Sequence, residues 1–151
     1  MFCPDPVRAL SEVRRVLKPN GRAVLAVWAP AAENPMFSVT NGVMAKHGLL
    51  QPPPPNALTP FTFAEPGSLS VKMREAGFSD VHEEPRDVNW SWPGGPDSHI
   101  AFMKSTQPAT QRALDAAPPE VLDELRAAMG KYHDGSQLNY GARIYIVRAV
   151  K

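Results

Sequence analysis

Four histidines and one cysteine could bind a metal or act as nucleophiles, and their spacing favours neither role. His47, His82, His99 and His133 are scattered, and no two have the spacing of a zinc motif. His99 is therefore expected to be a surface or core residue rather than a general base. Cys3 has no obvious base beside it in the sequence, which indicates an inert thiol. The sequence thus predicts no metal site and no catalytic residue.

Glycine pairs and aromatic side chains offer two further kinds of site. The pair Gly94-Gly95 stands between prolines and lacks the strand-to-helix setting of a phosphate loop. No P-loop, HExxH motif or nucleophile elbow occurs. Trp90 and Trp92 fall on one face of an expected strand, where they could stack on a flat ligand, although such pairs more often belong to a core or an interface.

The first elements of the chain are a helix and an apolar strand. Asp5-Pro6 is typical of a helix start, because Asp caps the first turn and proline is tolerated there. Apolar residues at three- and four-residue steps continue the helix to Lys18, and Pro19-Asn20-Gly21 stops it. The unbroken apolar run Ala23–Ala29 predicts a strand buried on both faces, with neighbours on both edges.

A long proline-rich segment follows, from residue 30 to 63, and is expected to be largely loop. It holds much of a proline excess of 17 in 151 residues. Apolar spacing allows a short helix over Pro35–His47. The run Pro52–Pro55 is read as a stiff connection within the domain, with a ligand for an aromatic-lined groove as the alternative.

The remaining pattern alternates helices and strands. Helices are predicted over Ser68–Ala76 and Pro119–Tyr132, and strands over Val81–Trp92 and Ala142–Val150. Pro85 inside the first of these strands indicates a sheet edge or a bulge. The elements predict an α/β fold.

The length of the chain limits the number of domains, and its net charge limits the classes of partner. The 151 residues suit one domain, residues 1–151. A formal net charge of +1, from 16 basic and 15 acidic residues, argues against nucleic-acid and acidic-membrane partners. No apolar run approaches 18 residues, and the beginning of the sequence lacks the pattern of a signal peptide. A cytoplasmic location is the default expectation.

The order of these residues resembles a known family. Residues 5–22 read D-P-x-x-A-L-x-E-x-x-R-V-L-K-P-x-G-R, and residues 76–81 read A-G-F-x-x-V. Both are similar to the C-terminal half of class I S-adenosylmethionine-dependent methyltransferases of the type 11-like kind. The resemblance implies a partial Rossmann-like sheet with strands equivalent to five, six and seven, the last antiparallel and between the other two. Asn20 replaces a glycine usual in that family, a mild departure because Asn tolerates left-handed backbone.

The resemblance also implies what this chain lacks. The family holds S-adenosylmethionine through a glycine-rich loop after strand one and an acidic residue ending strand two, and no D-x-G-x-G-x-G segment occurs here. The chain alone is therefore expected to bind no cofactor and to be catalytically incompetent. In a small-molecule subgroup the region after strand five walls the substrate pocket, which makes Trp28, Asn34 and Pro35 the substrate-side candidates, with a structural role as the alternative.

Three functions remain open: a methyltransferase-derived fragment, a non-catalytic small-molecule-binding or dimerisation module, and a half-enzyme that needs a partner chain. Without a fourth strand, the strand Ala23–Ala29 would expose one apolar edge, which is a template for association. We therefore expect a homodimer, formed through this edge or through freed helix faces.

Overall fold

The computed structural model describes residues 1–54 and 56–151, with all their side chains except those of residues 108 and 109. Pro55, the last residue of the run Pro52–Pro55 that was interpreted as a stiff connection, lies outside the described residues. The chain divides into two compact units, and the single domain over residues 1–151 stays a prediction. The first comprises residues 1–33, 54–88 and 143–151, and the second comprises residues 34–53 and 89–142.

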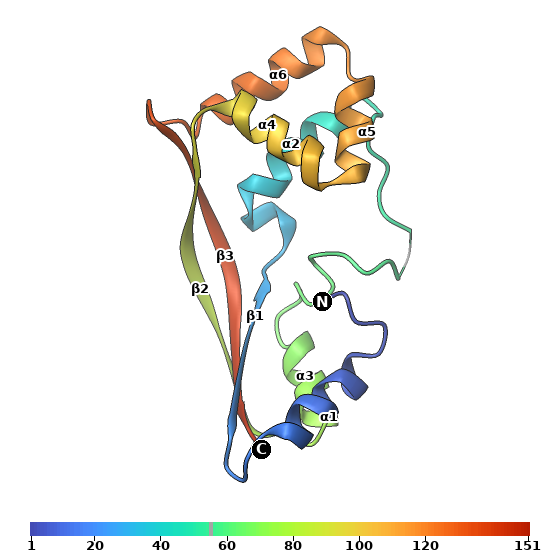
Figure 1. Cartoon of the computed structure of the whole chain (residues 1–151), viewed down its shortest axis with the longest axis vertical. Helices are drawn as coiled ribbons and strands as arrows, with labels where there is room; N and C mark the ends of the chain where they lie inside the picture. The colour runs from blue at the N-terminus through green and yellow to red at the C-terminus, as the bar shows by residue number, and fades with distance from the viewer. Residues whose placement is uncertain (55) are drawn as a thin grey trace. The chain divides into compact units, whose positions relative to one another are not determined.

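Each unit is built from its own helices, while two long strands contribute residues to both (Figure 1). The first unit contains α1 (Pro6–Val16), β1 (Arg22–Trp28), the 3-10 helix η1 (Ala31–Glu33) and α3 (Ser68–Glu75). The second contains α2 (Pro35–Lys46), α4 (Pro96–Thr106), α5 (Pro108–Ala116) and α6 (Pro119–Gly130). The shared strands are β2 (Ser79–Pro93) and β3 (Gln137–Val150).

The three strands form one sheet in the order β1-β3-β2. β1 pairs antiparallel with β3 from Arg22 opposite Val150 to Trp28 opposite Ile144. β2 lies on the other side of β3 and runs antiparallel to it (Figure 1). The Ser79 hydroxyl, at the start of β2, donates to the Val150 carbonyl, at the end of β3, at 3.3 Å. The last strand is therefore antiparallel and central, as predicted. Pro85 lies on an edge strand, where its missing N–H is tolerated.

The predicted start of α1 and end of α3 are both confirmed. The Asp5 carboxylate accepts the Arg8 backbone N–H at 2.9 Å and caps α1. Gly77 follows α3 with φ of +89°, the left-handed conformation that glycine adopts without strain. The Phe78 N–H then reaches back to the Met73 carbonyl at 3.1 Å, which returns the chain towards the sheet.

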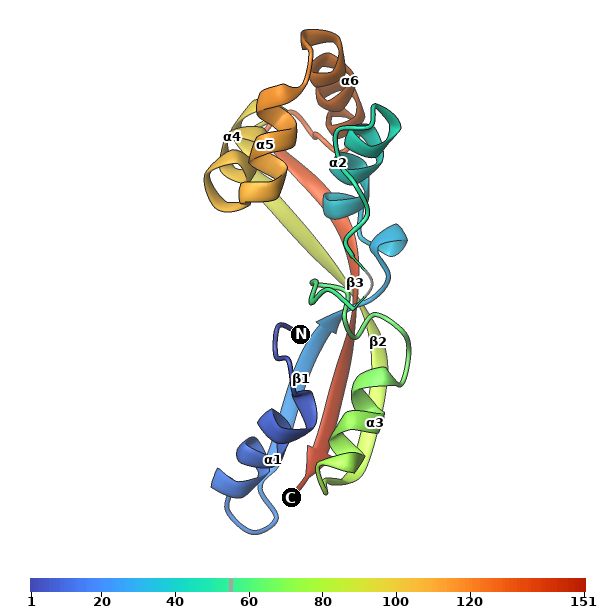
Figure 2. The ribbon, with the colours of Figure 1, turned by 90° about the vertical axis from the view of Figure 1, so that its right-hand side faces the viewer.

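The helices α1 and α3 cover the same face of the sheet in the first unit (Figures 1 and 2). Side chains from both helices pack with residues of β1 and β3; the buried set includes Leu10, Val27, Leu69, Met73, Tyr145 and Val147. The prediction that β1 is buried on both faces is wrong. Exposure alternates along the strand, and Val24 is 65% exposed, because the helices of this unit cover only one face.

The second unit has a separate helical core. Its buried residues come from all four helices and from β3, and include Met44, Ile100, Leu114, Leu125, Met129 and Tyr140. Two helices were predicted, over Pro35–His47 and Pro119–Tyr132, and both are present. α4 and α5 were not predicted. The segment 30–63, expected to be largely loop, contains η1 and α2.

Two residues on α3 give a test of the first core. Met73 is fully buried, whereas Val71 on the same helix is 48% exposed. Replacing Met73 by Ala should lower the free energy of unfolding by about 2 to 5 kcal/mol, because it removes buried apolar contacts and leaves a cavity. The matched Val71→Ala change should stay within about 0.5 kcal/mol. Urea denaturation followed by fluorescence measures both, and equal losses would contradict this assignment of the core.

Candidate functional site

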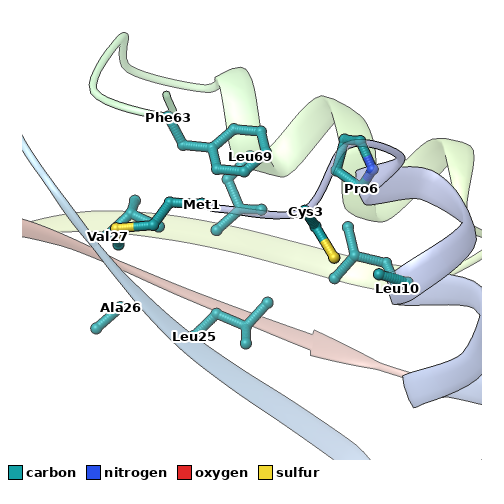
Figure 3. A pocket seen from close by; sticks show the side chains of 10 residues that line it. Met1, Cys3, Pro6, Leu10, Leu25, Ala26, Val27, Phe63 and Leu69 are labelled. Atoms are coloured by element: carbon teal, nitrogen blue, oxygen red, sulfur yellow. The ribbon is translucent and has the colours of Figure 1, made fainter. Parts of the chain in front are cut away.

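An apolar pocket of about 200 Å³ opens beside β1 in the first unit (Figure 3). It is bounded by the first residues of the chain, by α1, by β1 and by the segment that leads into α3. The lining residues are Met1, Cys3, Pro6, Ala9, Leu10, Leu25, Ala26, Val27, Phe63 and Leu69.

The position of this pocket follows from the strand residues that line it. Leu25, Ala26 and Val27 are consecutive, and successive side chains of a strand point to opposite faces. A space that touches all three must therefore lie at the edge of β1. Because β1 pairs with β3 on one side, this is the opposite edge, which has no strand partner among residues 1–54 and 56–151.

A second hollow, of about 290 Å³, adjoins the same edge. Met1, Ala26 and Val27 line both spaces. The second hollow adds Trp28, Val88 and Ile144. Trp28 and Ala26 lie on the open face of the strand, opposite to Leu25 and Val27. The edge of β1 is thus flanked by an apolar hollow on each face of the sheet.

The chemistry of the first pocket favours apolar groups. None of its ten lining side chains carries a charge, and the thiol of Cys3 is the one nucleophile among them. Cys3 is exposed and unpaired with another cysteine. Within the described part of the chain, no group of three or more His, Cys, Asp or Glu side chains could hold a metal ion. The pocket can bind hydrocarbon side chains and has no acid or base for catalysis.

The three predicted substrate-side residues fall into two different units. Trp28 ends β1 in the first unit, is half-buried and lines the second hollow. Asn34 and Pro35 begin α2 in the second unit. Asn34 is fully buried, and its carbonyl accepts the Phe37 N–H at 2.9 Å, so its position at the helix start already has a structural use. Asn34 and Pro35 are adjacent in the sequence, and the substrate role of all three residues stays a prediction.

An ion-pair cluster that the sequence did not reveal fixes the chain after β1. The Arg143 guanidinium donates to the Asp87 carboxylate at 2.7 Å and to the Glu33 carboxylate at 2.9 Å. Its hydrogen bond and charge lower the pKa of Asp87, and the two carboxylates raise the pKa of Arg143. Since this arginine already contacts two carboxylates, it ties η1, β2 and β3 together rather than offering an anion site.

The second unit contains a cluster of aromatic rings around His99. The His99 ring lies 5.3 Å from the Trp92 ring and 5.4 Å from the Trp90 ring, between centroids. Its Nδ1 is 3.4 Å from the Tyr140 hydroxyl, and the side chain is buried. His99 was expected to be a surface or core residue, and it lies in the core. The two tryptophans are partly buried and pack against the same core.

The cavity beside these rings is small. It has a volume of about 30 Å³, enough for a water molecule, and is lined in part by Thr40, His99 and Gln107. Small-molecule sites are usually several hundred Å³. This cavity is therefore too small for a substrate, whereas the apolar pocket beside β1 is larger, at about 200 Å³.

Comparison with solved structures gave matches, whereas comparison by sequence gave none. No family model and no curated protein matches the sequence. One solved structure, from Bacillus halodurans C-125, is described as a "putative methyltransferase". Its sequence is 20% identical to this one, and the TM-score is 0.45. The match covers 99% of this chain and 59% of the Bacillus chain. This chain therefore spans less than two thirds of that protein's length. A likeness of this size defines no family. No helix in the described residues is long and apolar enough to cross a membrane.

Burial of His99 gives a prediction about pH. Burial disfavours the charged imidazolium and lowers the pKa of His99 from 6.5 to about 4. Between these values the unfolded chain binds a proton that the folded chain does not, so stability rises with pH. The wild type should therefore lose up to about 3 kcal/mol of unfolding free energy as the pH falls from about 6.5 to about 4.

Replacing His99 by Phe should remove this part of the pH dependence, because the variant has no group there to titrate. The exposed His82 provides the matched control, since His82→Gln leaves the buried ring in place. Urea denaturation at several pH values measures the slope for each protein. An unchanged slope in His99→Phe would refute the assignment.

Proposed function

We propose that this chain is the C-terminal half of a class I S-adenosylmethionine-dependent methyltransferase, type 11-like, from a lineage that acts on small molecules. Alone, it binds S-adenosylmethionine too weakly to act as a methyltransferase. Its three strands are equivalent to strands five, six and seven of that fold. Two observations on the chain support this proposal, and one observation supports the loss of cofactor binding.

The principal observation is how residues 5–22 are used in the fold. The motif begins at the Asp5 cap, runs through α1 and ends at the first residue of β1. The residues that this chain has in the turn suit its backbone. Asn20 adopts φ of +60°, and a Cβ at Gly21 would lie 2.7 Å from the Lys18 carbonyl oxygen. The pattern therefore corresponds to a helix, a tight turn and a strand in the order that the resemblance implies.

The second observation is the place of the last strand. β3 lies between β1 and β2 and runs antiparallel to them, the arrangement that the resemblance implies for a seventh strand. The last residue of the sequence is also hydrogen-bonded to residues of the 5–22 motif. The backbone N–H of Lys151 donates to the Gly21 carbonyl at 2.8 Å, and its ammonium donates to the Leu17 carbonyl at 2.6 Å.

The residues present do not fit S-adenosylmethionine. Dinucleotide-type sites use a glycine-rich turn that leads from a strand into a helix N-terminus, with an acidic residue for the ribose. After β1, the described chain enters the three-residue η1, whose Glu33 is paired with Arg143. The pocket beside β1 offers no charged side chain for a ribose or a sulfonium. We therefore derive no methyl-transfer step for this chain.

Two related roles are part of the proposal. Trp28, Asn34 and Pro35 remain the substrate-side candidates by resemblance. We further propose that the chain forms a homodimer in the cytoplasm, with no nucleic-acid or membrane partner. The exposed Val24 beside an unpaired strand edge supports association. The alternatives are a non-catalytic binding or dimerisation module and a half-enzyme with a separate partner chain that carries the glycine-rich loop.

Calorimetry with S-adenosylmethionine tests the cofactor proposal. We expect no saturable heat up to about 1 mM ligand, which corresponds to a binding free energy weaker than about −4 kcal/mol. S-adenosylhomocysteine serves as a second probe of the same site. Saturable micromolar binding of either compound to the purified chain would refute the claim that it lacks a cofactor site. Co-purification with a chain that carries a glycine-rich loop would favour the half-enzyme alternative.

A further inference from the structure

The outer edge of β1 has a shape and sequence that suit a particular occupant. We propose that β1 pairs with β1 of a second copy, antiparallel and about a two-fold axis at Leu25, which joins two three-stranded sheets into one. This inference rests on the homodimer proposed above and names its surface and register. It does not depend on the methyltransferase lineage.

The backbone hydrogen bonds to β3 show which groups face outward. The Lys151 N–H donates to the Gly21 carbonyl, and the Ala29 N–H donates to the Arg143 carbonyl. Both bonds join directly opposite residues of the antiparallel pair, so the odd-numbered residues of β1 direct their N–H and C=O groups at β3. The even-numbered residues direct theirs away from β3. Val24 and Ala26 therefore present donors and acceptors at the outer edge.

Pairing about Leu25 satisfies these groups. Val24 of one copy then stands opposite Ala26 of the other, and the two residues exchange both backbone hydrogen bonds, as do their symmetry mates. Leu25 stands opposite Leu25 in a pair without mutual hydrogen bonds, where the side chains approach most closely. Opposite residues have the same parity in this register, so the helix-covered faces of the two sheets coincide.

The two hollows beside the edge match the side chains that this register delivers. Leu25 of the second copy would lie next to Leu25, at the first pocket, which Leu25 lines. Val24 of the second copy would lie next to Ala26, at the second hollow, which Ala26 lines. Val24 is 65% exposed in the single chain, so pairing would cover apolar surface that now faces water. Met1 lines both hollows and is the residue that the second strand would displace.

The position of the single charged residue of β1 favours the antiparallel orientation of a second copy. Arg22 is the one charged residue of β1, and the six residues after it are uncharged. Parallel pairing in register would place the two arginines together and would cost electrostatic free energy. Antiparallel pairing separates them and sets each Arg22 opposite Trp28 of the other copy on the same face. A guanidinium beside an indole ring is a favourable arrangement.

A cysteine at the two-fold axis tests the register. Opposite residues without mutual hydrogen bonds have Cα atoms about 4.5 Å apart, within the range that a disulfide spans. In a Cys3→Ser background, which removes the single native thiol, Leu25→Cys should give mostly covalent dimer on mild oxidation, seen on a non-reducing gel. Val71→Cys in the same background places an exposed thiol on α3 and should stay largely monomeric. Failure of Leu25→Cys to cross-link above this control would overturn the register.

A charge at the exposed edge tests the surface without touching the core. Val24→Lys places like charges close together in the proposed pair and should raise the dimer dissociation constant at least about tenfold in sedimentation experiments. Val71→Lys carries the same change on α3 and should leave it unaltered. Circular dichroism checks that both variants fold. A wild type that stays monomeric at micromolar concentration, or a Val24→Lys dimer as tight as the control, would overturn the proposal. Neither result bears on cofactor binding, which calorimetry measures separately.

Discussion

The helices of the first unit cover only one face of its sheet, and the other features of that unit depend on this asymmetry. Leu10 from α1 and Met73 from α3 shield the inner face, whereas Val24 on the opposite face stays in water. Fully burying a side chain of this size is worth about 1.5 to 3 kcal/mol. Val24 gains little of this free energy in the single chain, because it is 65% exposed.

In the second unit, the polar imidazole ring of His99 is buried in an apolar core. His99 is surrounded by tryptophan and tyrosine rings and keeps one contact to the Tyr140 hydroxyl. Burial favours its neutral form, which removes the charge that such a core could not accommodate. Ring contacts of this kind contribute about 0.5 to 1.5 kcal/mol each beyond burial. The arrangement stabilises the unit and leaves room for little more than water.

Sequence patterns located most elements, and their failures have physical causes. Asp5-Pro6 marked the start of α1 correctly, because helix capping depends on local residue types. The two-sided burial predicted for residues 23–29 was wrong, since composition cannot reveal whether another element covers a face. α4 and α5 escaped prediction, although each begins with a proline at a position that helices tolerate. The Arg143 cluster joins residues far apart in sequence, which no local pattern could show.

The central place of β3 also governs when the sheet can exist during synthesis. β1 and β2 are complete by residue 93, yet each has β3 as its partner in the described sheet, and β3 spans residues 137–150. Neither strand can therefore pair with its partner in this sheet before β3 has been synthesised. Pairings between such distant residues form slowly, because the loop must close before any contact is gained. Stalled or shortened chains would expose both strands, which makes them natural substrates for chaperones and proteases.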